Sequence, residues 1–345
     1  MMPDAAQGLA PAPFIVAMML AAALVSALLT WLARGFALRR RMVDEPGRRR
    51  SHAQATPRGG GVGFVLVAIA AAASLPLTGW GPAPLWLAFA LGSAAVAVAG
   101  GLDDVGGLRP RWRFAVHLAS AAGYCLVLLG MPGSGGEWAL LGLAVLYLAG
   151  LVNAWNFIDG IDGIAASQGL VVAVALACLS AGTGAGLLAW TLAGGLLGFL
   201  PFNMPRARIF MGDVGSGTLG FALGALALQA AASGAMHWLG MLVLVSACGI
   251  DTALTLVKRI LQGKAWWSAH REHLYQWLVR RGSSHFRATA SYFLWTATVC
   301  ALFAYLALVE PGLQAPVAIF VLALAASAWF LLRARLRMSV RGPKR

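Results

Sequence analysis

Eleven long apolar segments run through this sequence of 345 residues, and they limit the fold more than any other feature. Each is roughly 18–21 residues long, which is enough for a helix to cross a bilayer. Only 11% of the residues are charged, against about 25% in a typical soluble domain. We therefore expect lipid to be the main solvent, and each segment should be a helix because lipid offers the backbone no hydrogen bonds. The predicted spans are 13–33, 61–78, 84–101, 114–131, 138–157, 164–181, 184–202, 215–232, 235–256, 290–309 and 315–332.

The positions of Lys and Arg predict the orientation, because cytoplasmic loops of membrane proteins are enriched in these residues. With the N-terminus outside, the inner segments hold all 26 Lys and Arg residues and the outer loops hold none. Residues 1–13 carry no basic residue, so we expect no secretory signal peptide. The sequence predicts one all-α polytopic membrane domain over 1–345, with a periplasmic N-terminus and a cytoplasmic C-terminus. The expected cytoplasmic segments are 34–60, 102–113, 158–163, 203–214, 257–289 and the basic tail 333–345.

The net charge of +14 follows from this basic inner face, which suits anionic headgroups and phosphorylated substrates. A nucleic-acid function would need a basic domain outside the bilayer, and the sequence contains none. Most acidic residues share the same face, several of them next to the ends of predicted spans. We therefore expect a polar cleft at the cytoplasmic face. The acids on this face are Asp44, Glu45, Asp103, Asp104, Asp159, Asp162, Asp213, Asp251 and Glu272.

The second cytoplasmic segment contains two adjacent carboxylates, Asp103 and Asp104. Neighbouring charges at the edge of a bilayer are costly unless they bind a cation or a proton. Capping of helix N-termini is the structural alternative. Prenyl synthases also place Asp-Asp pairs on Mg²⁺, but they need a further Asp nearby, and the next one here is Asp159. We favour a cation or proton site.

A dense polar run, N-x-x-N-x-x-D-G-x-D-G, surrounds the third cytoplasmic segment. Its polar side chains are Asn153, Asn156, Asp159 and Asp162, and they lie where one apolar segment ends and the next begins. Such a run cannot stabilise a helix in lipid. Oxygen ligands and tight glycine turns suit Mg²⁺ and phosphate, so the run predicts a metal or phosphate site.

Two glycine-rich blocks carry further candidates. Gly212 and Asp213 begin the sequence G-D-V-G-S-G just before a span, where a carboxylate and backbone N–H groups suit a metal or a phosphate. Arg58 precedes three glycines, and a guanidinium beside a glycine run can bind phosphate. A basic topogenic loop is the alternative for the second block.

The longest cytoplasmic segment contains H-R-E-H-L-Y-Q, from His270 to Gln276. His270 and His273 would share one face of a helix. Zinc binding is the alternative, but the H-E-x-x-H spacing is absent and the sequence offers no evident third side chain to bind the ion. Contacts with a nucleotide diphosphate fit better, which makes His270, His273 and Arg271 candidates for substrate binding. His52 and His285 are also cytoplasmic, in weaker sequence contexts.

The five blocks, taken in this order, resemble those of the polyprenyl-phosphate N-acetylhexosamine-1-phosphate transferases, glycosyltransferase family 4. These enzymes start the lipid intermediates of O-antigen, enterobacterial common antigen, teichoic acid and peptidoglycan. The resemblance covers nearly the whole chain, from about residue 40 to about residue 280. The S-H-x-x-x-T-P-R-G-G-G stretch and the H-x-x-H-x-Y-Q ending look closest to the O-antigen initiating branch.

The resemblance implies ten or eleven transmembrane helices, in agreement with the predicted spans, and a cleft at the cytoplasmic face of the bacterial inner membrane. It implies transfer of a sugar 1-phosphate from a UDP-N-acetylhexosamine to undecaprenyl phosphate, with release of UMP. The implied cofactor is Mg²⁺, with Mn²⁺ as a substitute. A homodimer is one expected form.

The resemblance also implies roles for single residues. Asp103 and Asp104 match an acidic pair whose first member deprotonates or orients the lipid phosphate. Asp213 matches a metal ligand, and Asn156 matches a position that helps to hold the metal. Asp159 and Asp162 match acids of the nucleotide–metal region, and His270 and His273 match a motif that contacts the donor. The remaining substrate-binding candidates are Arg58, Asn153, Gly212 and Arg271.

Two departures from the family pattern narrow the function. Glu272 stands where other branches carry a third His, so a donor contact from that His does not carry over. The consecutive His residues of the muramyl-pentapeptide branch are absent, which argues against peptidoglycan precursor synthesis.

A transporter or flippase would place charges in mid-span, where this chain has none. A CDP-alcohol phosphotransferase would follow Asp-Gly with Ala-Arg, whereas Asp159 is followed by Gly160 and Ile161.

Overall fold

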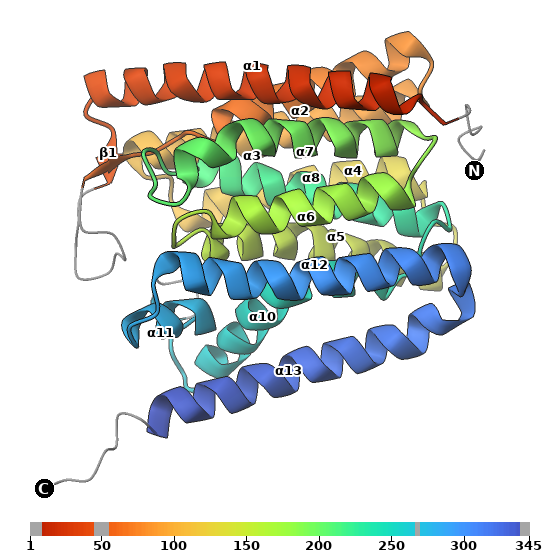
Figure 1. Ribbon diagram of the computed structural model, residues 1–345. Helices are drawn as coiled ribbons and strands as arrows, with labels where there is room; N and C mark the ends of the chain where they lie inside the picture. Colours follow the sequence, from red (N-terminus) through yellow and green to blue (C-terminus); the bar gives the residue numbers. More distant parts are fainter. Residues whose placement is uncertain (1–8, 45–54, 266–269, 339–345) are drawn as a thin grey trace, which may run out of the picture.

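The computed structural model describes residues 9–44, 55–265 and 270–338. Most of these residues form helices that run side by side in one bundle (Figure 1). Ser51 and His52 of the first cytoplasmic block, and 339–345 of the basic tail, lie outside the described residues. The helices and strands are α1 (Ala12–Arg39), β1 (Val43–Asp44), β2 (Thr56–Pro57), α2 (Val62–Ser74), η1 (Leu75–Thr78), α3 (Ala83–Gly106), α4 (Pro110–Leu129), α5 (Gly135–Ile158), α6 (Ile164–Leu179), α7 (Gly184–Asn203), α8 (Gly212–Ala232), α9 (Gly240–Leu244), α10 (Ser246–Leu261), α11 (Leu274–Arg280), α12 (His285–Val309), η2 (Pro311–Leu313) and α13 (Gln314–Met338).

The predicted all-α polytopic class is confirmed. Among the described residues, 8 helices are long and apolar enough to cross a membrane, and two shorter apolar helices cover Val62–Thr78 and Ile164–Leu179. The span predicted over 235–256 is broken instead, because α9 ends at Leu244 and α10 begins at Ser246. The number of membrane crossings stays a prediction.

Helix α10 buries a row of polar and charged side chains along one face. Asp251, Thr255 and Arg259 recur every fourth residue, so they share one face of the helix, and all three are buried. This face contacts α12, α13 and the α11 region rather than lipid. Hydropathy averaged over the segment does not register such a face, which is why the sequence predicted a plain span there.

Helix α8 is the centre of the bundle and contacts α2 to α7 and α9. Nearly all of its apolar stretch is buried. Glycines permit this close packing: a Cβ atom at Gly220 would lie 2.6 Å from the carbonyl oxygen of Leu151 in α5. A Cβ atom at Gly100 in α3 would lie 2.3 Å from the carbonyl oxygen of Asp213. The end of α3 therefore lies directly against the start of α8.

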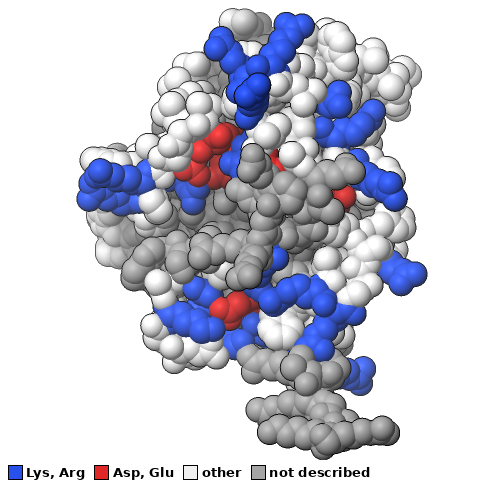
Figure 2. All heavy atoms as spheres, turned by 90° about the vertical axis from the view of Figure 1, so that its left-hand side faces the viewer, with Lys and Arg blue, Asp and Glu red and all other residues white. Residues whose placement is uncertain are grey.

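The polar segments of the chain gather at one end of the bundle, on the left in Figure 1, where β1 and α11 lie. Strands β1 and β2 pair antiparallel there, with Val43 opposite Pro57. Figure 2 looks onto this end and shows Lys and Arg side chains spread across it, with acidic side chains between them. Helix α1 begins at the opposite end of the bundle from the one where α13 ends (Figure 1), as an odd number of crossings requires.

Candidate active site

Three carboxylates from α3 and α8 meet at the basic end of the bundle. Asp104 accepts hydrogen bonds from the backbone N–H groups of Asp213 and Val214, each at 3.1 Å. Its side chain is 3% exposed. Asp104 therefore caps the first turn of α8, since these N–H groups have no partner within the helix. Asp104 thus makes the helix-capping contacts of the structural alternative, while its predicted catalytic role stays a prediction.

Asp103 has different partners from its neighbour. Its Oδ2 atom lies 2.5 Å from Nη1 of Arg113, and its Oδ1 atom accepts a hydrogen bond of 2.7 Å from the Leu108 N–H group. The same Nη1 atom of Arg113 lies 2.6 Å from Oδ2 of Asp213. One guanidinium nitrogen thus bridges carboxylates of two helices.

Arg113 was not among the residues singled out by the sequence. It lies in the expected cytoplasmic segment 102–113, but Arg109 and Arg111 share that segment, and spacing alone does not distinguish the three. Arg113 is partly buried, whereas Arg109 and Arg111 are exposed. Only the fold shows which of them reaches the acidic side chains.

Arg58 reaches the same acidic group from the β1–β2 ribbon. It forms an ion pair with Asp44, and its Nη1 atom lies 3.8 Å from Oδ1 of Asp104. The backbone N–H groups of Gly60 and Gly61 donate to the carbonyl oxygens of the segment before α8, each at 2.9 Å. These two N–H groups therefore join the loops together and are not available to a phosphate.

Gly212 lies where this ribbon, α3 and α8 meet. Its φ angle is +75°, a conformation that glycine adopts without strain. A Cβ atom at this position would lie 2.5 Å from Oδ2 of Asp104 and 2.8 Å from the nitrogen of Gly59. The structure thus explains the glycine by close packing, while its predicted contact with substrate stays a prediction.

The end of α5 brings one of the two predicted Asn residues to α8. Nδ2 of Asn156 donates to Oγ of Ser216 at 3.3 Å, so the amide oxygen is the atom that remains for a cation. Asn153 instead donates to the carbonyl oxygen of Ala149 in its own helix at 2.8 Å. Asn156 thus contacts α8 through Ser216, whereas Asn153 gives no comparable link, and the metal role of Asn156 stays a prediction.

Asp159 follows directly after α5 and is close enough to the other acids to sense their charge. Burial, followed by the carboxylates of Asp213, Asp104 and Asp162, raises the pKa of Asp159 to about 8. Carboxylates crowded in this way repel one another, and a bound cation would relieve the repulsion. Asp159 therefore belongs to the acidic group formed by Asp103, Asp104 and Asp213.

Asp162 is directed to a different partner. Its Oδ2 atom lies 3.3 Å from Nδ1 of His285, at the start of α12, and its carbonyl oxygen accepts a hydrogen bond from the Thr289 hydroxyl group. Asp162 and His285 line an open hollow of about 720 Å³ together with Arg206 and Arg208. The structure thus pairs Asp162 with a histidine for which the sequence gave only weak support.

The rings of the two predicted histidines lie against each other beside the end of α5. The ring centroids of His270 and His273 are 4.9 Å apart, and the ring of Phe157 lies 6.0 Å from that of His273. Burial, together with charge from His273 and Arg259, lowers the pKa of His270 to about 4. Burial likewise lowers the pKa of His273. Both rings are therefore neutral near pH 7 and would recognise a ligand by hydrogen bonding or stacking.

Tyr275 connects this histidine segment to the polar loop after α5. Its hydroxyl group donates to the carbonyl oxygen of Phe157 at 3.0 Å. A Cβ atom at Gly160 would lie 2.1 Å from the same hydroxyl oxygen, so only glycine fits beneath the tyrosine. The histidines and Asp159 therefore share one wall of the site.

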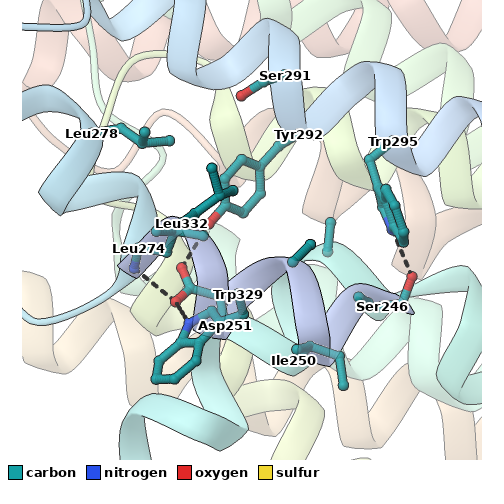
Figure 3. Close-up of a pocket in the computed structure, with 13 residues that line it drawn as sticks. Ser246, Ile250, Asp251, Leu274, Leu278, Ser291, Tyr292, Trp295, Trp329 and Leu332 are labelled. Atoms are coloured by element: carbon teal, nitrogen blue, oxygen red, sulfur yellow. Dashed lines mark hydrogen bonds between the residues drawn. The ribbon is translucent and has the colours of Figure 1, made fainter. Parts of the chain in front are cut away.

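Asp251 joins the start of α11, directly after the histidine segment, to α12 and α13, and Figure 3 shows its hydrogen bonds. Its Oδ1 atom accepts hydrogen bonds from the Leu274 N–H group at 2.7 Å and from Nε1 of Trp329 at 2.9 Å. Its Oδ2 atom accepts one from the Tyr292 hydroxyl group at 2.8 Å. The residue is 1% exposed and borders a small cavity of about 160 Å³. The available signal was a single carboxylate inside a predicted span, which needs partners in lipid.

Glu272 turns away from the histidines. It lies 2.5 Å from Nη1 of Arg259 and 3.0 Å from Nζ of Lys264. Burial alone would raise the pKa of Glu272, but Lys264 and Arg259 outweigh it, so the pKa is lowered. The residue that replaces the third histidine of other branches therefore fixes α10 to the loop before α11.

The carboxylates of Asp103 and Asp213 suit a divalent cation whose remaining ligands come from the substrate and water. In the described part of the chain, no group of three or more His, Cys, Asp or Glu side chains is arranged to hold a metal ion. Asp103 and Asp213 nevertheless converge on a single cationic nitrogen. Mg²⁺ commonly uses one or two carboxylates together with substrate phosphates and water. Zinc, which needs three or four protein ligands, fits the histidine pair poorly.

Comparisons with known proteins identify the family of the chain. Residues 86–231 match the family model described as "Glycosyl transferase family 4". The chain is 33% identical to the decaprenyl-phosphate N-acetylglucosaminephosphotransferase of Mycolicibacterium smegmatis, over 85% of this chain and 83% of that protein. It is 34% identical to a phospho-N-acetylmuramoyl-pentapeptide-transferase of a Synechococcus strain, over 69% and 74% of the two chains.

A further relative is the probable undecaprenyl-phosphate N-acetylglucosaminyl 1-phosphate transferase of Bacillus subtilis. It is 26% identical over 79% of each chain. The matched family model covers α3 to α8, which supply Asp103, Asp104, Arg113, Asp159 and Asp213. The protein belongs to glycosyl transferase family 4, the family of the polyprenyl-phosphate N-acetylglucosamine phosphotransferases.

Proposed function

We propose that the protein transfers an N-acetylhexosamine 1-phosphate from a UDP-sugar to undecaprenyl phosphate at the cytoplasmic face of the bacterial inner membrane. One observation carries the proposal. Asp103 and Asp213, from two different helices, converge on one cationic nitrogen at the basic end of an apolar bundle. The names of the relatives, which act on polyprenyl phosphates, support the choice of acceptor.

The reaction is an exchange at phosphorus. An oxygen of the lipid phosphate attacks the β-phosphorus of the UDP-sugar and forms a new P–O bond. The bond between this phosphorus and the bridging oxygen breaks, and UMP leaves with that oxygen. The lipid phosphate is mostly dianionic at neutral pH, because its second pKa is about 6. A strong base is therefore not needed, and Asp103 is free to serve as a metal ligand.

Charge neutralisation and positioning are the main demands of phosphoryl transfer. Mg²⁺ bound by Asp213 and Asp103, with the amide oxygen of Asn156, would supply positive charge to the diphosphate. Arg58 and Arg113 already place guanidinium groups at these carboxylates. In this arrangement the protein supplies both the ligands and the counter-charges for two phosphorylated substrates.

The histidine segment is the proposed donor site. His270 and His273 lie beside Phe157, on the wall that also contains Asp159. Neutral imidazoles can hydrogen-bond to or stack on the nucleotide without adding charge. Arg271, between them in sequence, adds a positive charge suited to a phosphate.

We propose the sugar and the pathway from the names of the relatives. N-acetylglucosamine in the name of the mycobacterial relative favours UDP-N-acetylglucosamine as the donor. The product would begin a lipid-linked glycan of the cell envelope, such as O-antigen.

An assay of purified protein tests the function. Detergent-solubilised protein is mixed with undecaprenyl phosphate, Mg²⁺ and a panel of UDP-N-acetylhexosamines, and UMP is measured. We expect UMP release that requires the lipid and that disappears in Asp213→Asn. UMP formation without lipid, or none with any donor, would overturn the proposal. Movement of lipid or sugar across vesicles without UMP would favour the transporter alternative.

A further inference from the structure

Arg113 lies where a cation shared by two carboxylates would lie. Its Nη1 atom is 2.5 Å from Asp103 and 2.6 Å from Asp213, and its side chain is 22% exposed. The other arginines of the same stretch do not share this position: Arg109 and Arg111 are exposed, and the guanidinium of Arg111 lies over the ring of Trp112. Of these three arginines at the start of α4, Arg113 contacts the acidic side chains, whereas Arg109 and Arg111 stay at the surface.

A guanidinium and a divalent ion cannot both occupy this position. Mg²⁺ binds carboxylate oxygens at about 2.0–2.1 Å, which is closer than the N–H donor approaches them here. A cation placed between Asp103 and Asp213 would therefore displace Nη1 of Arg113. Two ionised carboxylates exceed the charge of one guanidinium by one, so a divalent ion matches them better than the single charge of arginine.

We propose that Arg113 takes the place of the divalent cation in the metal-free enzyme, and that metal binding displaces its guanidinium onto a substrate phosphate. This inference rests on the proposed function for the presence of a metal and a phosphate. A displaced arginine on the first turn of α4 stays within reach of the same group. Guanidinium groups pair with phosphate through two parallel hydrogen bonds. Arg113 therefore neutralises the carboxylates of Asp103 and Asp213 before the metal binds, and it positions the substrate phosphate afterwards.

The binding of Mn²⁺ without substrate tests the first half of the proposal. Free Mn²⁺ is titrated by electron paramagnetic resonance against wild type, Arg113→Gln and the matched control Arg111→Gln. We expect Arg113→Gln to bind Mn²⁺ about tenfold more tightly than wild type, because a charge-assisted competitor is gone. Arg111→Gln should bind like wild type. A folded Arg113→Gln protein with unchanged or weaker Mn²⁺ affinity would overturn the proposal.

Chemical labelling of the wild-type protein tests the same displacement without a variant. Phenylglyoxal modifies accessible guanidinium groups, and peptide mass spectrometry reports the modification of each arginine. Addition of Mg²⁺ should increase the labelling of Arg113 and leave that of Arg111 unchanged. Equal labelling of Arg113 with and without Mg²⁺ would contradict displacement, even if the Arg113→Gln variant failed to fold.

The second half of the proposal predicts a kinetic signature. Arg113→Gln should bind the metal more tightly and yet show a higher KM for a phosphorylated substrate, a combination that a merely structural role would not produce. An unchanged KM for both substrates would refute the phosphate contact. The Mn²⁺ titration and the labelling contain no substrate. A protein that displaces Arg113 but never releases UMP would refute the proposed function and leave the displacement standing.

Discussion

Asp104 and Asp213 are joined by a hydrogen bond of 3.1 Å in which the carboxylate of Asp104 accepts the backbone N–H group of Asp213. This bond fixes the end of α3 to the start of α8. The neighbouring Asp103 instead contacts Arg113, which in turn contacts the Asp213 side chain. The acidic pair is therefore divided, with one member holding the backbone and the other facing the reacting groups.

This division predicts different effects of the two alanine substitutions. Asp104→Ala removes a helix cap and should destabilise the fold by about 1–2 kcal/mol. Activity should fall as well, because the first turn of α8 would be displaced. Asp103→Ala should nearly abolish UMP release while the melting temperature stays closer to that of wild type. Thermal unfolding in detergent and UMP release measure the two effects. Equal destabilisation by both substitutions would contradict the division.

The sequence predicted that its acidic blocks would meet, and the structure brings most of them together. The basis of that prediction was the segregation of Lys and Arg, because loops that share one side of a bilayer converge at one end of a bundle. The division of the acidic pair could not be predicted. Adjacent residues on a helix point about 100° apart, so their partners depend on which helices pack on each side.

The prediction of one unbroken span over 235–256, where the structure has α9 and α10, failed for a similar reason. Hydropathy measures how apolar a segment is, whereas Asp251, Thr255 and Arg259 matter through the face they share. That face can be recognised from a four-residue spacing, but its partners Tyr292 and Trp329 come from α12 and α13. Contacts between helices so distant in sequence are not encoded in any local pattern. The same is true of Asp162 and His285, which are 123 residues apart.

Asp213→Asn should abolish UMP release and remove the Mg²⁺ dependence of any remaining activity. Asparagine keeps the size of the side chain but loses the charge that a divalent ion and Arg113 require. The measurement is UMP release against Mg²⁺ concentration. Glu310→Gln is the matched control, because Glu310 is an exposed acid after α12 and far along the chain from the acidic group. An active Asp213→Asn enzyme with a normal Mg²⁺ dependence would remove the metal assignment.

His270 should contribute a loss of stability as the solution becomes more acidic than about pH 6.5. Its pKa is lowered from 6.5 to about 4 by burial and neighbouring positive charge. Between these values the unfolded chain binds a proton that the folded chain does not, so stability is complete above pH 6.5 and decreases toward pH 4. His270→Gln should make this decrease shallower.

The melting temperature measured from pH 8 to pH 5 checks this expectation. His237→Gln serves as the control, because His237 lies between α8 and α9, away from the histidine segment. His270→Gln should also raise the KM for the UDP-sugar. An identical pH slope in wild type and His270→Gln would show that His270 does not contribute.

Asp251→Ala should lower both the stability and the affinity for the donor. Five donors would lose a buried acceptor: the N–H groups of Leu274 and Tyr275, the hydroxyl groups of Thr255 and Tyr292, and the indole N–H group of Trp329. Each donor left unsatisfied costs about 1–3 kcal/mol. Because Asp251 holds the start of α11, the histidine rings should shift and the KM for the UDP-sugar should rise. Tyr292→Phe removes one of these bonds and should cost only about 1 kcal/mol. An Asp251→Ala protein with the KM of wild type would show that the histidine segment is held in place by other contacts.

Binding of divalent cations should be tightened by the UDP-sugar, because the described residues supply only part of the coordination of the ion. The diphosphate would complete the coordination that Asp103 and Asp213 begin, so UDP-N-acetylglucosamine should tighten Mn²⁺ binding by about 5–150-fold. By the same linkage, Mn²⁺ should tighten donor binding by an equal factor. Calorimetric titrations of each ligand in the presence and absence of the other measure both factors. Chelation by EDTA should abolish UMP release, and re-addition of Mg²⁺ should restore it. Mn²⁺ affinity that is already high and does not respond to the donor would mean that the protein supplies a complete metal site by itself.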